Sequence, residues 1–182
     1  MRKRIYLVLL LIAAIAILFT GCKTPLEQHL DKGNSYFDKG KWDEAITEYT
    51  AAIEIDPENA QAYGNRGAAY AEKGTYEDSI PDYSKAIELD PQNAVLYYNR
   101  AIAYNYLGEY EKAIADCTTV IEELELRNNW AYFQRGIAYF ALGRYNDALN
   151  DFYNAKKQTS SEEFQEKVDQ YIQRIDDIAK GK

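Results

Sequence analysis

The chain has 182 residues, with 21 Lys and Arg against 29 Asp and Glu and a single His, which gives a formal net charge of -8. Because so acidic a surface repels phosphate, the composition argues against sequence-independent binding of nucleic acid. One His and two Cys cannot form a His/Cys metal cluster, so we expect neither a metal nor another cofactor. Tyr is frequent (17) while Gly (10) and Pro (4) are scarce, which is typical of a helical chain.

The beginning of the chain predicts export. A basic stretch at 1–4 precedes an uncharged run at 5–19 and two small residues, which is the pattern of a secretory signal peptide. A membrane-spanning helix needs about 20 apolar residues, so the run is somewhat short for one. The alternative is an uncleaved N-terminal anchor helix.

The segment 18–22 resembles the lipobox of bacterial lipoproteins, in which a small residue precedes a cysteine that becomes lipid-modified after cleavage. Phe19 stands where that pattern prefers Leu. The resemblance implies a removed signal peptide at 1–21, lipidation of Cys22 with palmitate-type acyl chains, and a tether at 22–25. Such chains hold a protein on a membrane without a spanning helix. Cys117 then has no intramolecular partner, and we expect it to be a buried apolar residue.

The rest of the chain repeats itself. Four glycines recur at intervals of 34, 34 and 35, each two residues before an aromatic residue, and an upstream tyrosine recurs at the same intervals. Self-similarity of this kind predicts stacked structural repeats. The glycines are Gly40, Gly74, Gly108 and Gly143, and the tyrosines are Tyr36, Tyr70, Tyr104 and Tyr139.

Helix signals subdivide each unit into two halves. Tyr63, Gly67 and Tyr70 fall on one helix face, and the small middle residue lets a neighbouring helix approach. Asp56 and Asp90, each followed by Pro, are expected to cap the next helix. Pro81 falls inside another predicted helix, where it can cost about 3 kcal/mol or kink the helix.

These features resemble the tetratricopeptide repeat (TPR), a helix pair of 34 residues. The resemblance covers about 26–156 and implies an all-α fold, an α-solenoid of four TPR helix pairs in a right-handed superhelix plus a C-terminal capping helix. The implied units are 26–59, 60–93, 94–128 and 129–159, and the capping helix is 160–182. The third unit contains one extra residue, so the junction after it should be looser than the others.

Both ends of the repeats have helix-capping signals. Ser160 with Glu163 predicts a capping box for the last helix, whose alternative role is to bind a partner as an amphipathic helix. Thr24 with Glu27 predicts that the first helix begins about two residues after Cys22, so the solenoid should lie close to its membrane.

In TPR proteins the first helix of each pair lines a concave face that binds partners. Mapping that face onto this chain makes unit two small and acidic, whereas units three and four are aromatic and aliphatic. The expected partner-binding residues are Asn34, Asn65, Tyr98, Asn99, Ile102, Tyr106, Trp130, Phe133, Ile137 and Phe140. The alternative is that the aromatic residues among them pack against adjacent helices or the cap.

One binding mode of the family, the carboxylate clamp for peptide C-termini, is not supported. Asn34 and Asn65 match two of its positions, but Leu30, Val95 and Asn99 stand where it needs cations. The repeated arginines Arg66, Arg100 and Arg135 are expected to pair with acidic residues of neighbouring helices.

The sequence thus predicts a non-catalytic adaptor of the bacterial cell envelope that binds a protein or peptide partner in the concave groove. It would be lipid-anchored to the outer membrane on the periplasmic side or, in a host with one membrane, to the outer face of the cell membrane. The alternative is an assembly lipoprotein that forms a homo-oligomer or assists pilus or secretion-system biogenesis. An enzyme is not expected, because acidic pairs such as Glu162 and Glu163 are neighbours on solvated helix faces.

Overall fold

The computed structural model describes residues 23–124 and 129–181. The predicted signal peptide and the predicted lipidation site at Cys22 lie outside the described residues, as does most of the junction after unit three. Within the described ranges all regular structure is helical. The elements are α2 (Pro25–Phe37), α3 (Trp42–Ile55), α4 (Ala60–Lys73), α5 (Tyr76–Leu89), α6 (Ala94–Tyr106), α7 (Tyr110–Thr118), the π-helix η1 (Thr119–Glu123), α8 (Asn129–Ala141), α9 (Tyr145–Lys157) and α10 (Glu162–Ala179).

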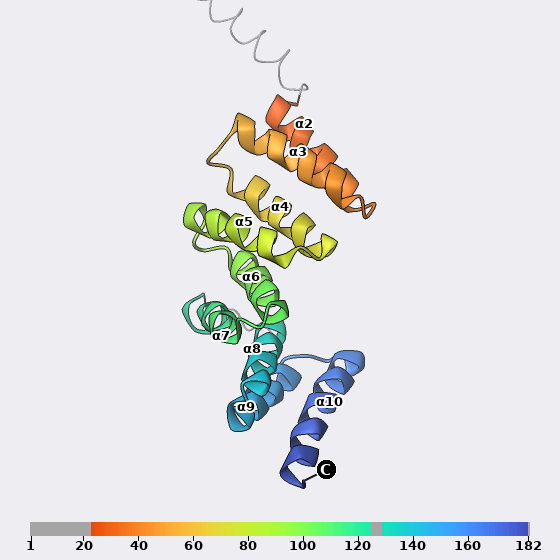
Figure 1. Cartoon of the computed structure of the whole chain (residues 1–182), viewed down its shortest axis with the longest axis vertical. Coiled ribbons are helices and arrows are strands. Elements are labelled where there is room, and N and C mark those ends of the chain that lie inside the picture. Colours follow the sequence, from red (N-terminus) through yellow and green to blue (C-terminus); the bar gives the residue numbers. More distant parts are fainter. Residues whose placement is uncertain (1–22, 125–128, 182) are drawn as a thin grey trace, which may run out of the picture.

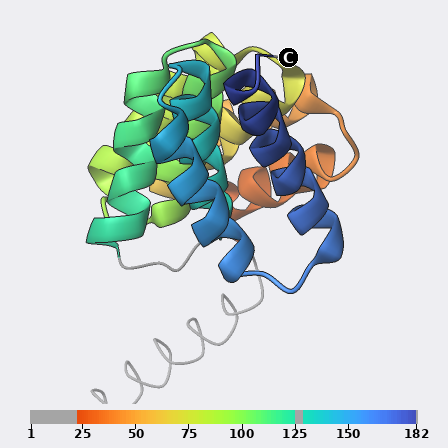
Figure 2. The same ribbon diagram turned by 90° about the horizontal axis from the view of Figure 1, so that it is seen from below.

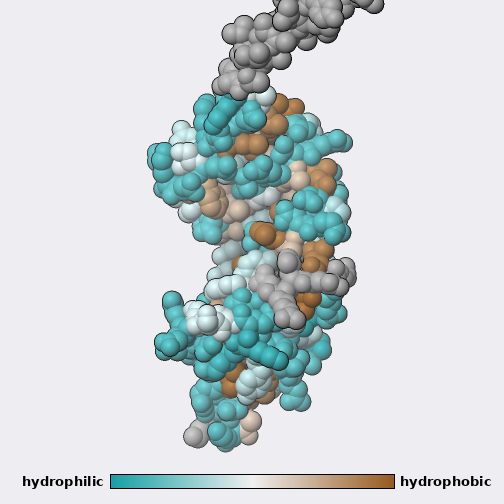
Figure 3. Space-filling view, turned by 180° about the vertical axis from the view of Figure 1, so that it is seen from behind, coloured by the Kyte–Doolittle hydropathy of each residue, from teal (hydrophilic) through white to brown (hydrophobic). Residues whose placement is uncertain are grey.

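The helices pack as consecutive pairs that stack into an elongated molecule (Figure 1). The pairs are α2–α3, α4–α5, α6–α7 and α8–α9, and each second helix also packs against the first helix of the next pair. The predicted all-α fold of stacked helix pairs is confirmed. Seen from behind, the surface is mostly hydrophilic, with apolar residues in separate patches (Figure 3).

The start of the first helix agrees with the sequence signals, whereas the starts of α4 and α6 correct them. Thr24 and Glu27 form the predicted capping box of α2. Asp56 and Asp90, however, end the preceding helices, and the caps of the following ones are Asn59 and Asn93. The Asp56 carboxylate accepts instead from the Glu58 backbone N–H and the Asn59 side chain, and so orders the turn that positions the cap.

Two predicted irregularities have different outcomes. Helix α5 continues through Pro81 to Leu89. Pro81 and Glu77, whose carbonyl loses its helical donor to the proline, are both exposed, so water can solvate that carbonyl. In the third unit the chain ends its second helix in a π-helical turn, where the Leu124 N–H donates to the Thr119 carbonyl at 3.0 Å. A π turn contains one more residue than an α turn and so takes up extra chain.

The centre of each pair matches one small residue with one larger residue sixteen positions later. A Cβ added at Gly33 would lie 2.5 Å from a ring atom of Tyr49, and one at Gly136 would lie 2.6 Å from a ring atom of Phe152. In the third unit the two sizes are closer, because its fully buried pair is Ala and Cys. The four pairs are Gly33–Tyr49, Gly67–Tyr83, Ala101–Cys117 and Gly136–Phe152. Burial raises the pKa of the Cys117 thiol, as expected of an unreactive core residue.

The predicted pairing of the repeated arginines is confirmed. In each case Nε and Nη2 donate to both carboxylate oxygens of an Asp in the same pair, at 2.7–3.0 Å. Nη1 donates to a hydroxyl of the preceding pair at 2.9–3.0 Å, so one side chain joins two repeats. The sets are Arg66 with Asp82 and Thr50, Arg100 with Asp116 and Ser84, and Arg135 with Asp151 and Thr118.

The last helix, α10, lies along α9 at the end of the stack (Figure 2). Its cap is Ser161, whose hydroxyl accepts from the Phe164 N–H at 3.3 Å, and not Ser160 as the sequence suggested. Phe164, Val168 and Ile175 are buried in the core of the fourth pair. The helix therefore covers the apolar end of the solenoid, as stacked repeats require.

Because the sizes of the two residues at the centre of each pair are matched, we expect substitutions at Ala101 and Cys117 to have coupled effects on stability. Cys117→Tyr alone should destabilise the protein by about 1–3 kcal/mol, because Ala101 leaves no room for a ring. Adding Ala101→Gly should recover about 1 kcal/mol or more, because it recreates the small–large pair of the other units. Urea unfolding of both single variants and the double variant measures this coupling. If the changes in the free energy of unfolding of the two single variants simply add in the double variant, the size matching is contradicted.

Candidate functional site

Two adjoining hollows run along the first helices of the first three pairs. One, of about 180 Å³, lies between α2 and α4, and the other, of about 310 Å³, lies between α4 and α6. Asn65 and Ala68 line both hollows, which makes them one continuous surface. We call this surface the amide groove, and its principal residues are Asn34, Phe37, Asn65, Ala68, Val95 and Asn99.

The side-chain amides are arranged in a row along the groove. Asn65 Nδ2 donates to Asn34 Oδ1 at 3.0 Å, and the Tyr49 hydroxyl donates to the same oxygen at 2.8 Å. In the described part of the chain, Asn65 Oδ1 and the whole amide of Asn99 have no hydrogen-bond partner. An amide both donates and accepts, so these groups can bind the N–H and C=O groups of a peptide backbone.

The orientation of Asn34 depends on the hydroxyl of Tyr49. Burial, and secondarily the negative charge of Asp38, raise the pKa of Tyr49 to about 12. The protonated hydroxyl donates to Asn34 Oδ1, which fixes that atom as the acceptor end of the amide.

Carboxylates are the charged groups of the amide groove. Asp38 lines the first hollow and Asp90 lines the second, and no Lys or Arg belongs to the described lining of either. The positions where a carboxylate clamp needs cations hold Leu30, Val95 and Asn99. The groove thus has the charge opposite to that of a clamp.

Exposed apolar residues extend the concave surface toward the third pair. Val95 is 61% exposed and Tyr106 is 68% exposed, and the Tyr106 ring stacks on Tyr76 with centroids 4.3 Å apart. Tyr98 and Ile102 are half-buried. The predicted residues from Asn34 to Tyr106 are therefore placed along three successive first helices.

In the fourth pair the structure corrects the prediction. Phe133 is only 1% exposed, and its ring packs against Phe152, Phe164 and Tyr171 with centroids 5.4–5.9 Å apart. Ile137 and Phe140 pack against the same cluster. Helix α10 lies over this face, so Phe133 is a core residue and is not available to a partner.

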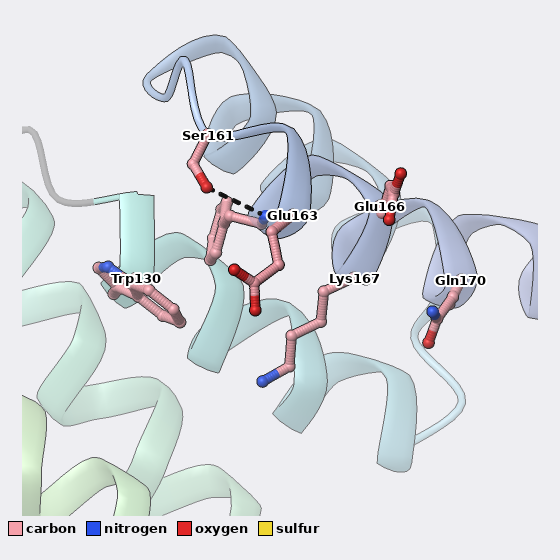
Figure 4. A pocket seen from close by; sticks show the side chains of 7 residues that line it. Trp130, Ser161, Glu163, Glu166, Lys167 and Gln170 are labelled. Atoms are coloured by element: carbon pink, nitrogen blue, oxygen red, sulfur yellow. Dashed lines mark hydrogen bonds between the residues drawn. The ribbon is translucent and has the colours of Figure 1, made fainter.

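Trp130 is the exception in the fourth pair. It is 43% exposed and borders a hollow of about 480 Å³ between α8 and α10 (Figure 4). Its indole packs edge-on against Phe164, 4.4 Å between centroids, and Glu163 and Lys167 of α10 lie on the other side of the hollow. The sequence placed Trp130 on the concave face but did not show that α10 forms the opposite wall.

Asp90 and Tyr49 are the parts of the site that the sequence analysis missed. Tyr49 lies on the second helix α3 and Asp90 directly follows the second helix α5, whereas the prediction considered first helices alone. The recurrence of a large aromatic residue sixteen positions after each small one was the available signal for Tyr49.

Metal-binding clusters and membrane-spanning helices are absent from the described ranges. No group of three or more His, Cys, Asp or Glu residues there is placed to hold a metal ion. None of the helices in the same ranges combines the length and the apolar character needed to cross a bilayer.

Comparison with known families identifies the fold. A model described as TPR repeat matches 33–74 and 69–105, and the tetratricopeptide repeat model matches 94–123. The chain therefore belongs to the TPR family. Members of this family are protein-interaction scaffolds, typically non-catalytic.

Solved structures agree with this assignment. The crystal structure of MamA superposes with a TM-score of 0.70 at 28% identity, over 73% of this chain and 77% of that one. The TPR domain of Arabidopsis OM64 is 31% identical, with a TM-score of 0.59 over 62% of this chain and 93% of the domain. MamA from Desulfovibrio magneticus RS-1 has a TM-score of 0.72 at 13% identity, over 88% of this chain and 98% of that one, a likeness of fold alone.

A curated relative shares a shorter stretch. Stress-induced-phosphoprotein 1 of Caenorhabditis elegans is 45% identical over 40 residues, which are 22% of this chain and 12% of that protein. The chain thus matches about an eighth of that relative's length.

The burial of Phe133 predicts a large effect on stability. Phe133→Ala should lower the free energy of unfolding by about 3–5 kcal/mol, because it empties the cluster beneath α10. Val95→Ala, in the open groove, should change it by less than about 0.5 kcal/mol. Denaturant unfolding of the two variants makes the comparison, and equal stabilities would show that α10 does not cover Phe133 in solution.

Proposed function

We propose that this protein is a lipid-anchored, non-catalytic adaptor of the bacterial cell envelope that holds a partner segment in the amide groove. The observation that carries the proposal is the row of amides on α2, α4 and α6, with Asn65 Oδ1 and Asn99 open to a ligand in the described part of the chain. It differs from the sequence-based hypothesis in excluding Phe133, which lies beneath α10.

Two kinds of contact would hold the partner. Amides bind the main chain and fix its direction, since each presents a donor and an acceptor. Val95 and Tyr106 offer apolar surface at the third pair, and aromatic side chains are frequent anchors of interfaces. Side chains that bind a peptide main chain and apolar surface are suited to recognition and not to catalysis.

The anchoring part of the proposal rests on the lipobox-like segment and on the start of α2. Because Thr24 caps the helix, only Lys23 and Thr24 separate the Cys22 position from Pro25, which makes three steps along the chain. At about 3.5 Å per residue, the tether is about 10 Å long. The first pair would then lie at the membrane surface, on the periplasmic side of an outer membrane or on the outer face of a single membrane.

If Cys22 is lipidated, the Cys22→Ser variant should retain the N-terminal segment and take up no labelled palmitate. The cause is that acylation requires the thiol, and the acylated form is stably membrane-bound through its chains. Metabolic labelling followed by immunoprecipitation tests this, with Cys117→Ser as the control that keeps its label. Equal labelling of Cys22→Ser and wild type would contradict lipidation at this residue.

Partner binding predicts position-dependent crosslinking in living cells. A photoreactive phenylalanine analogue at Tyr106, on the concave surface, should capture a partner. The same analogue at Tyr153 should not, although that tyrosine on α9 is similarly exposed, at 59% compared with 68%. The crosslinked products of both variants are detected by immunoblotting and identified by mass spectrometry. A band obtained equally from both positions would place binding outside the groove.

A further inference from the structure

The charges around the amide groove are one-sided. Asp38 and Asp90 line its two hollows, and neither carboxylate has an ion pair or a side-chain hydrogen bond with any described residue. Two cations of the first two pairs are engaged in ion pairs outside the described lining of the groove, Lys73 with Asp43 and Arg66 with Asp82. Uncompensated carboxylates around a recess favour a cationic occupant.

The negative charge acts inside the groove as well as at its edge. Burial is the main reason that the pKa of Tyr49 is raised, and the charge of Asp38 adds to it. Asp38 lines the same hollow as Tyr49 and Asn34, so a cation bound there would meet both a carboxylate and the amide row.

The repeat also sets a spacing. Asn65 and Asn99 are 34 residues apart at equivalent points of α4 and α6. Packed helices lie about 10 Å apart, and an extended chain advances about 3.3 Å per residue. Equivalent groups on neighbouring pairs therefore face residues of an extended ligand that are about three positions apart.

From these observations we infer that the occupant of the amide groove is an extended internal segment of a partner protein that carries Lys or Arg side chains. This inference rests on the proposed function and specifies its ligand. A free C-terminus is disfavoured, because Leu30, Val95 and Asn99 provide no cation for its carboxylate. Basic side chains would reach Asp38 and Asp90 while the amides bind the intervening main chain.

The test is selection from a displayed library of random 12-residue peptides, flanked on both sides so that no free terminus is offered. The target is the full chain in detergent micelles. The recovered peptides should be enriched in Lys and Arg, and they should elute with salt, since the exposed ion pairs are screened.

Three variants test whether the selected peptides bind in the groove. Ala68→Trp fills both hollows and should abolish binding, whereas Ala115→Trp, at an exposed alanine of α7, should leave it unchanged. Asp38→Asn with Asp90→Asn keeps the shape and should weaken binding of the basic peptides about fivefold, as expected for two exposed ion pairs. Circular dichroism checks that each variant is folded.

The outcomes separate the inference from the proposed function. Neutral or acidic peptides that Ala68→Trp excludes would leave the groove as the binding site and overturn the basic ligand. Basic peptides that bind the Asn double variant with unchanged affinity would also overturn it. Selected peptides that bind Ala68→Trp as well as wild type would instead refute the groove itself.

Discussion

The order of the whole stack depends on an arginine that bonds in two directions. In pairs two to four its guanidinium holds an aspartate of its own pair and a hydroxyl of the pair before, so the angle between pairs is fixed at each step. Asp151, at the last step, is only 1% exposed, so removal of Arg135 would leave a buried charge unpaired, at a cost of about 3–5 kcal/mol. Because this arginine contact recurs in successive pairs, equivalent residues of successive first helices line up. The amide row is one consequence.

Helix α10 divides the concave face into two parts with different roles. Over the fourth pair, α10 buries Phe133 and packs on Phe140, and it leaves Trp130 partly exposed beside a hollow lined by Glu163 and Lys167. Over the first three pairs the face is open and lined by amides and carboxylates. The apolar surface that the solenoid would expose at its end is thus used for stability, and the polar part is left for recognition.

What the sequence could predict follows from how local each signal is. The helix pairs and the arginine positions recur at intervals of 34 or 35 residues, so the pattern alone indicates them. The caps were less certain, because Asp56 and Asn59 compete within one turn and only the folded chain shows that Asn59 accepts from Ala62. For Phe133 the sequence left two alternatives, a groove residue or packing against the cap, and the second is the one observed. The repeat could not choose between them, because α10 lies outside it and its packing is a tertiary contact. Tyr49 and Asp90 were missed because they enter the groove from a second helix and from the residue directly after one.

The most direct test of recognition by the amide groove is nuclear magnetic resonance of isotope-labelled protein titrated with a peptide from the crosslinked partner. The side-chain amide signals of Asn34, Asn65 and Asn99 and the indole signal of Trp130 report on the two parts of the concave face separately. We expect the three amide signals to shift with the same midpoint while the Trp130 signal stays in place. A shift of Trp130 with unmoved amides would place the partner beside α10 and contradict the account.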